Sequence, residues 1–240
     1  MKCHPARHDM AGGQKPFQAK TNDTPKSVVD DKLKPSAEMH ILVGGPYTDP
    51  SGEEHRYGHT ALRIKTKNSD LTYDFGRYGK ISGTFGESGE GILRVWNSFQ
   101  PYISGEIALQ RKTTGFVYSI FDHQASLSNI YFDCLIKSGK KIEGKSTSTK
   151  LVYKLATDYH ALGPNCTTLS IDGAKQAINN IDQGSEKNNK PEDVLTFTER
   201  MALKAKGGSS RLFLPANLLA FLNTGQPVKP LRVDIYGNGK

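Results

Sequence analysis

Residues 58–76 read GHTALRIKTKNSDLTYDFG, two runs of alternating apolar and polar residues on either side of a polar cluster at 67–70. Such a cluster between two alternating runs predicts a β-hairpin, in which successive side chains point to opposite faces. The alternation places His59 and Asp74 on matching, more polar faces, whereas Tyr73 falls among the apolar residues. We therefore expect this part of the chain to form a sheet rather than a helical bundle.

The rest of the chain adds further strands and several helices to the hairpin. Apolar runs bounded by turn residues predict strands, and apolar residues at i, i+3 and i+4 predict amphipathic helices. The expected strands are 39–44, 92–96, 106–110, 115–121 and 151–157, and the expected helices are 126–139, one that starts at Cys166, 193–205 and 214–222. This pattern predicts an α+β fold, with an antiparallel sheet packed against a helix that carries Cys166 at its N-terminus.

The chain divides by composition into a short polar segment and one domain. Residues 1–37 hold few apolar positions and four prolines, at 5, 16, 25 and 35, which is typical of a flexible arm. The texture changes at the apolar run 39–44, and the 240 residues fit one domain of the usual size, roughly 100–200 residues. We expect an N-terminal arm over 1–37 and a catalytic domain over 38–240.

The formal charge of +8 suits an acidic partner such as nucleic acid, an anionic membrane surface or an anionic wall polymer. It does not choose among them, and because the lysines are spread along the chain rather than packed in one run, the alternative is a charge that only keeps the protein soluble. The sequence contains no recognisable nucleic-acid motif, so we expect no specific nucleic-acid partner. No run approaches the ~18 apolar residues of a membrane span, and the first residues carry no apolar signal-peptide core. We expect a protein made in the cytoplasm without a cleaved signal and without a transmembrane segment.

Three cysteines, Cys3, Cys134 and Cys166, stand at spacings that indicate neither a disulfide framework nor a zinc site. We expect reduced thiols and no metal or cofactor. Cys134 belongs to the apolar stripe from Leu127 to Leu135 of the helix expected at 126–139, so it is expected to be a small buried hydrophobic residue.

Residues 163–166, GPNC, predict a tight turn followed by an N-terminal helix cap at Asn165 and Cys166 in the first turn of the helix. The backbone N–H groups and the helix dipole stabilise a thiolate at this position, and the same N–H groups can hold an oxyanion. The alternative is a cysteine that merely fills space at a helix start. Partners for the thiol would decide between the two.

Gly58-His59 opens a strand, residues 73–76 (YDFG) lie on the next strand, and Asn165-Cys166 stands at a helix start about a hundred residues later. This order resembles the permuted NlpC/P60 group of papain-like enzymes, which includes the lecithin retinol acyltransferase-like proteins. In ordinary papain-like enzymes the cysteine helix precedes the histidine strand, and in the permuted group the order is reversed. The resemblance covers roughly residues 59–166, under half of the chain.

The resemblance implies a role for each matching residue. Cys166 would be the nucleophile, His59 the general base, and a polar residue on the strand after His59 would orient the imidazole. Asp74 is the first choice for the orienting residue, because its face matches that of His59. Tyr78 replaces it if the hairpin is centred on residues 68–69, and Tyr73 is the remaining alternative.

Other histidines compete with His59 for the role of base. His160 lies six residues before Cys166, and His40 lies on the first expected strand. His55 and His59 are four residues apart and would share one face of a helix, but Gly58 and the β-like run make a helical metal pair improbable.

The resemblance further implies thiolate attack on an amide or ester carbonyl, here an amide bond in peptidoglycan stem peptides. Similar small basic domains without signal peptides are type VI secretion amidase effectors, antibacterial toxins that a secretion apparatus carries to a target-cell periplasm and that an immunity protein blocks. One alternative is a lipid acyltransferase or thioesterase of the permuted group, although no hydrophobic anchor is visible. The other is a non-catalytic basic binding protein whose cysteine is structural.

Overall fold

A computed structural model of the chain describes residues 34–48, 54–82, 88–205 and 211–238. The chain divides into two units, Met1–Lys34 and Pro35–Lys240, and the description below concerns the second. The expected flexible arm at 1–37 lies almost entirely outside the described residues. The second unit begins close to the expected domain start at residue 38.

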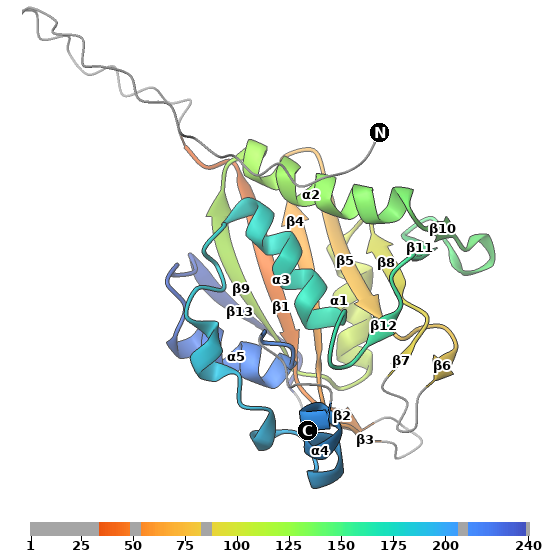
Figure 1. Cartoon of the computed structure of the whole chain (residues 1–240). Coiled ribbons are helices and arrows are strands. Elements are labelled where there is room, and N and C mark those ends of the chain that lie inside the picture. Colours follow the sequence, from red (N-terminus) through yellow and green to blue (C-terminus); the bar gives the residue numbers. More distant parts are fainter. Residues whose placement is uncertain (1–33, 49–53, 83–87, 206–210, 239–240) are drawn as a thin grey trace, which may run out of the picture. The chain divides into compact units, whose positions relative to one another are not determined.

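An antiparallel eight-stranded sheet forms the centre of this unit (Figure 1), in the order β10-β11-β8-β5-β4-β1-β9-β13. Every neighbouring pair in it is antiparallel. Its strands are β1 (Ala37–Gly44), β4 (His59–Lys65), β5 (Asp70–Gly76), β8 (Ile92–Trp96), β9 (Thr113–Ile120), β10 (Lys140–Lys141), β11 (Lys150–Lys154) and β13 (Arg232–Tyr236). The expected α+β class with an antiparallel sheet is confirmed, as is the hairpin, now β4 and β5.

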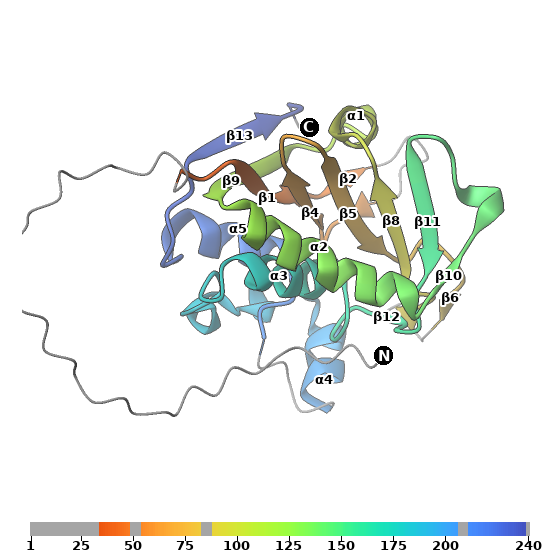
Figure 2. The same ribbon diagram turned by 90° about the horizontal axis from the view of Figure 1, so that it is seen from above.

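Helices cover both faces of the sheet. Figure 2 shows α2 and α3 on one side of the strands and α1 on the other. The helices are α1 (Phe99–Ala108), α2 (Asp122–Lys137), α3 (Cys166–Ala177), α4 (Phe197–Ala205) and α5 (Pro215–Thr224), with 3₁₀ turns at Glu143–Lys145, Ser185–Asn188 and Pro191–Asp193. Short strands form two smaller sheets, β2 (Tyr47–Thr48) with β3 (Glu54–His55), and β12 (Tyr159–His160) with β7 (Ser88–Gly89) and β6 (Ile81–Ser82).

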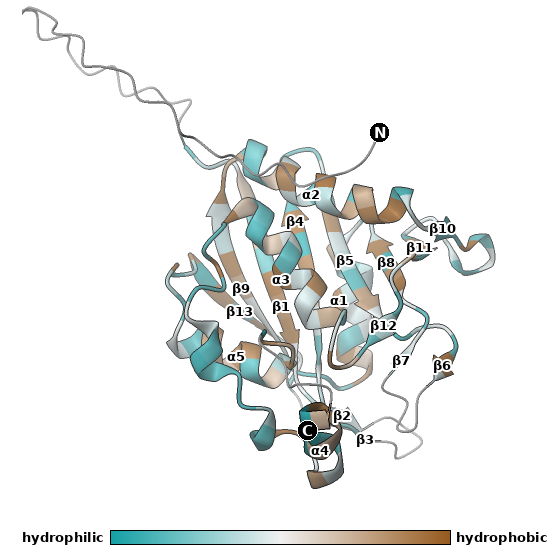
Figure 3. Ribbon diagram, in the orientation of Figure 1, coloured by the Kyte–Doolittle hydropathy of each residue, from teal (hydrophilic) through white to brown (hydrophobic). Residues whose placement is uncertain are grey.

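The strands alternate between two hydrophobic clusters, one on each face of the sheet. Leu62 and Tyr73 belong to the larger cluster, which also holds residues of α2, α3 and α5, whereas Ala61 belongs to a smaller cluster with residues of α1. Brown, hydrophobic stretches follow the central strands in Figure 3. Each fully buried large side chain contributes roughly 1.5–3 kcal/mol. The larger cluster therefore fixes α3, and with it Cys166, against the sheet.

α3 and α2 approach each other closely at Gly173. A Cβ atom there would lie 2.5 Å from the Phe132 ring, and the Ser128 hydroxyl donates to the Gly173 carbonyl at 2.9 Å. Only glycine allows this contact, so residue 173 sets the spacing of the two helices.

The strand expected at 106–110 is wrong. Residues 106–108 form the last turn of α1, and the buried side chains of that helix recur at i, i+3, i+4 and i+7, namely Phe99, Tyr102, Ile103 and Glu106. The proline at position 101 stands in the first turn, where its missing N–H costs nothing. The run 106–110 by itself covers only the end of this spacing, so it does not indicate a helix.

Two further helix predictions need correction. The buried residues of α2 are Ala125, Ser128 and Phe132, whereas Leu127 is exposed and Cys134 is only half-buried. The close approach at Gly173 favours the helix face that carries Ser128 and Phe132, both of which contact Gly173, rather than the predicted apolar stripe. The helix expected at 193–205 starts only at Phe197, because a 3₁₀ turn ends at Asp193 and residues 194–196 form an irregular connection. Within the described residues, no helix has the length and apolar character needed to cross a membrane.

Candidate active site

The N-terminus of α3 carries Cys166 as its first residue, as the sequence predicts. The Asn165 side chain accepts the Thr168 N–H at 3.0 Å, and the Thr168 hydroxyl accepts the Asn165 N–H at 2.9 Å, which completes a capping box. The Asn165 amide also donates to the carbonyls of Ala161 and Phe213, so the cap is tied to two loops. These bonds hold Cys166, which is 5% exposed, in one position.

The start of β4 brings His59 to the same place. Gly58 precedes it with φ +73°, and a Cβ atom at that position would lie 2.4 Å from the Gly44 carbonyl oxygen. The tight turn is therefore open only to glycine. On the other side of the strand, the hydroxyls of Thr60 and Thr167 lie 3.1 Å apart and connect β4 to α3.

The hairpin register decides which residue accompanies His59. Lys65 pairs with Asp70 and Leu62 with Tyr73, so the turn is centred between residues 67 and 68 rather than on 68–69. Asp74 follows on β5, and its Oδ1 lies 2.6 Å from Nε2 of His59. The structure thus brings His59 and Asp74 together in a buried pair.

Asp74 is held by two further side chains. The Tyr78 hydroxyl donates to Oδ1 at 2.9 Å and lies 3.3 Å from Nε2 of His59. Arg94 on β8 donates to Oδ2 from Nε at 2.7 Å and also from Nη2, and its guanidinium lies 3.6 Å from the centre of the Tyr78 ring. Burial would raise the pKa of Asp74, but the charges of Arg94 and His59 hold it well below its usual range. Asp74 is therefore a carboxylate.

His59 and Cys166 interact directly. Burial would lower the pKa of His59, but Asp74 and the Cys166 thiolate raise it to about 10. Burial would raise the pKa of the Cys166 thiol, but the charge and hydrogen bond of His59, the Thr60 N–H and the Thr167 hydroxyl lower it. Because Asp74 occupies Nε2, the other ring nitrogen, Nδ1, is the one left for the sulfur. The arrangement favours a thiolate–imidazolium pair at neutral pH.

Tyr159 is a member of the site that the sequence did not indicate. Burial, together with the charge of the Cys166 thiolate, raises the pKa of Tyr159, so its hydroxyl keeps a proton that it can donate toward the sulfur. Pairing of Tyr159 with Gly89 between β12 and β7 positions it, and the Arg77 guanidinium lies 5.9 Å from its ring centre. Its place seven residues before Cys166 was the only signal, and it is a weak one.

The structure gives two of the other candidate bases hydrogen-bond partners of their own. His40 is buried on β1, where Nε2 lies 3.0 Å from the Glu38 carboxylate, and burial together with Arg63 lowers its pKa to about 4. His160 accepts the Leu162 N–H at Nδ1 within its own loop.

Two further candidates also lie outside the cysteine site. His55 stacks on Tyr47 with ring centres 4.5 Å apart, and it sits on β3 rather than on a helix with His59. Tyr73 stacks on Phe132 at 3.9 Å in the core and donates to Asn129. Tyr73 therefore does not orient His59.

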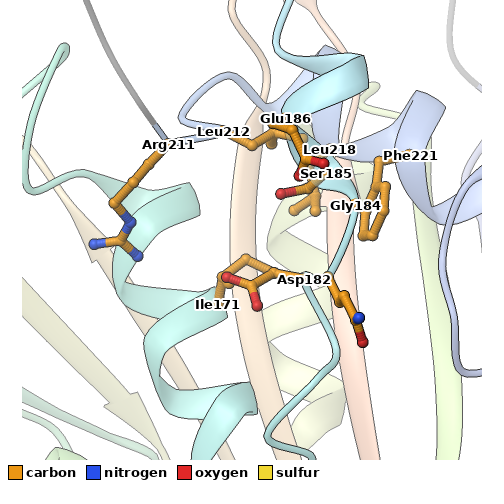
Figure 4. A pocket seen from close by; sticks show the side chains of 10 residues that line it. Ile171, Asp182, Gly184, Ser185, Glu186, Arg211, Leu212, Leu218 and Phe221 are labelled. Atoms are coloured by element: carbon orange, nitrogen blue, oxygen red, sulfur yellow. The ribbon is translucent and has the colours of Figure 1, made fainter.

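A cavity of about 390 Å³ lies beside α3 and α5 (Figure 4). Ile171, Leu218 and Phe221 supply apolar side chains to it, and Asp182 and Glu186 supply carboxylates. None of the lining residues belongs to the group around Cys166.

Comparison of the chain with protein-family models, with curated proteins and with solved structures found no match. The chemistry of the site is therefore argued from its geometry.

Proposed function

We propose that this protein is a cysteine hydrolase that cleaves an amide bond, with Cys166 as nucleophile, His59 as acid and base, and Asp74 as the residue that orients the imidazole. The observation that carries the proposal is the buried chain of contacts from the thiol to His59 and on to Asp74 at 2.6 Å. A structural cysteine has no need of a charged partner in a buried position, because burying a charge is costly unless it is paired.

The reaction follows from these contacts. The Cys166 thiolate attacks the carbonyl carbon, and the new C–S bond places negative charge on the carbonyl oxygen. The Tyr159 hydroxyl and the N–H groups at the start of α3 are the donors nearest to this oxyanion. His59 gives its proton to the amide nitrogen, the C–N bond breaks, and the amine leaves. His59 then takes a proton from water, which attacks the thioester and frees the acid and the thiolate.

We assign the papain-like core in permuted order to this chain on the same grounds. Three observations support the assignment: the histidine strand β4 precedes the cysteine helix α3 in the sequence, α3 packs on an antiparallel sheet, and the acidic partner lies on the strand after His59. The order matches the resemblance found between residues 59 and 166.

The proposed substrate is the peptide part of peptidoglycan. The resemblance supports this substrate, and the charge of +8 suits an anionic wall polymer. In this proposal the protein is an antibacterial effector of the type VI kind, which a secretion apparatus delivers to a target-cell periplasm and an immunity protein inhibits.

The test is a digest of purified peptidoglycan by the full chain, with products separated by chromatography and identified by mass spectrometry. New amine and carboxyl ends are expected with the parent and with Cys134→Ala, but not with Cys166→Ala. Fast alkylation of Cys166 without any cleaved product would refute the peptidoglycan substrate and leave an acyltransferase or thioesterase, tested next with phospholipid and thioester substrates. Slow alkylation typical of an ordinary thiol would refute the enzyme itself.

A further inference from the structure

The two ends of the eight-stranded sheet differ in character. One end is β10, a strand of two residues that are both lysines, Lys140 and Lys141, which is a common way to keep a sheet edge from pairing. The other end is β13, and among the described residues β13 pairs with β9 alone. Figure 1 shows β13 at the outer side of β9. Its second edge is thus the one long enough to accept another strand.

A row of apolar side chains lies along β13 and is open to solvent. Leu231, Val233 and Ile235 are 62%, 46% and 54% exposed. They alternate with polar residues, so they point to one face of the sheet. A long edge strand with such a row is a template for pairing with another chain. The opposite face carries Arg232 and Asp234, joined by a contact of 3.2 Å from Nε to Oδ2.

The order of these residues is complementary to itself in the antiparallel direction. When two copies of one strand pair antiparallel, the twofold axis between them is perpendicular to the sheet. Each side chain therefore keeps its face, and each residue pairs with a residue on the same face of the other copy. An axis at Val233 sets Val233 against itself, Leu231 against Ile235, and Arg232 against Asp234 of the other copy. An axis at 232 would oppose two arginines, and one at 234 would oppose two aspartates, which destabilises a cross-strand pair.

We infer that β13 pairs with β13 of a second copy of this chain about Val233, so that two eight-stranded sheets join into one continuous sheet. The new pairs bring the apolar row of each copy into contact and give each Arg232 an acidic neighbour in the other copy, besides its bond to Glu38 at 2.6 Å. Strands β9 and β1 separate β13 from β4. Pairing at β13 therefore does not involve the strand that carries His59, and it does not depend on the proposed reaction.

Sedimentation velocity of the full chain over a range of concentrations tests this pairing. The parent is expected to shift from monomer to dimer as concentration rises. Val233→Lys and Val233→Glu each place like charges together on the axis, so each alone is expected to sediment as a monomer at every concentration. An equimolar mixture of the two is expected to restore the dimer, because lysine then faces glutamate. Ile130→Lys, an equally exposed apolar position on α2, is the matched control and is expected to dimerise like the parent.

A cysteine on the axis gives a second readout that does not depend on affinity alone. In the variant Val233→Cys, the two cysteines at position 233 of the paired copies are expected to form a disulfide on mild oxidation. Residues opposite each other in an antiparallel pair lie close enough to bridge. Ile235→Cys is expected to form none, since it faces Leu231. Circular dichroism checks that each variant is folded. A parent that stays monomeric, a dimer unaffected by both Val233 charges, or a mixture that fails to associate would each overturn the proposal.

Discussion

Replacing Asp74 with asparagine is expected to remove the thiolate from Cys166 at low pH. The variant keeps the size of the side chain and removes its charge, which faces His59 across 2.6 Å. Two unit charges about 4 Å apart interact by about 4 kcal/mol at an effective dielectric constant of about 20, equivalent to about three pKa units. The pKa of His59 should then fall from about 10 to near its ordinary value or below, and His59 would no longer stabilise the thiolate.

The rate of alkylation by iodoacetamide at pH 6 reports this change. A thiol with a pKa of about 8.5 is ionised in about one molecule in 300 at that pH. A less acidic thiol gives a more nucleophilic thiolate, which offsets part of the loss of ionised thiol, so the net expected loss is about 10-fold. Labelling is read at Cys166 by mass spectrometry. Asp70→Asn, on the same strand and paired with Arg63, is the control and should leave the rate unchanged.

The pH dependence has a definite sign. The pKa of His59 is raised on folding, so its contribution to stability is full below its unfolded pKa and is lost as pH rises through about 10. The pKa of Cys166 is lowered, so its contribution is full above its unfolded pKa and is lost as pH falls through its folded value. Labelling of Cys166 that is unchanged by Asp74→Asn from pH 5 to pH 9 would refute the reasoning.

Three further changes test the surroundings of the site. Gly173→Ala drives a Cβ into the Phe132 ring and should lower the free energy of unfolding by about 1–3 kcal/mol, measured by urea denaturation. Asn165→Ala removes the cap of α3 and should lower that free energy by about 1–2 kcal/mol and slow alkylation of Cys166. Asn165→Asp keeps the acceptor for the Thr168 N–H but loses both donations to the Ala161 and Phe213 carbonyls, so it should not restore either property fully. Tyr159→Phe removes a donor to the sulfur and should reduce the kcat for amide cleavage by about 10- to 100-fold without unfolding the protein, and an unchanged kcat would exclude Tyr159 from the reaction.

Much of the candidate site is encoded in local patterns. The alternation at 58–76 is enough to predict a hairpin and to place His59 and Asp74 on matching faces, so Asp74 could be chosen as the partner of His59, whereas the register came only from the structure. Asparagine followed by cysteine after a glycine-proline turn is enough to predict a capped helix start. These features depend on residues within a few positions of one another, where backbone preferences and hydrogen bonds act directly.

The partners that set the charge state depend on contacts between distant segments. Arg94 reaches Asp74 because β8 pairs with β5, and Tyr159 reaches Cys166 because β12 pairs with β7. No local pattern marks either residue, since an arginine or a tyrosine at those positions is equally compatible with a solvent-exposed side chain.

Packing also explains the two predictions that were wrong, the strand at 106–110 and the buried face of α2. Residues 106–108 belong to a helix because α1 buries one side against the sheet, a period that spans more residues than the short apolar run reveals. α2 turns Ser128 and Phe132 inward because Gly173 lets α3 come close, which leaves the more hydrophobic Leu127 in solvent. The sequence alone thus determined most of the local elements and the positions of His59 and Cys166 within them. The tertiary structure decided which distant charges surround the dyad and which helix faces are buried, because these depend on the summed contacts of segments that meet only after folding.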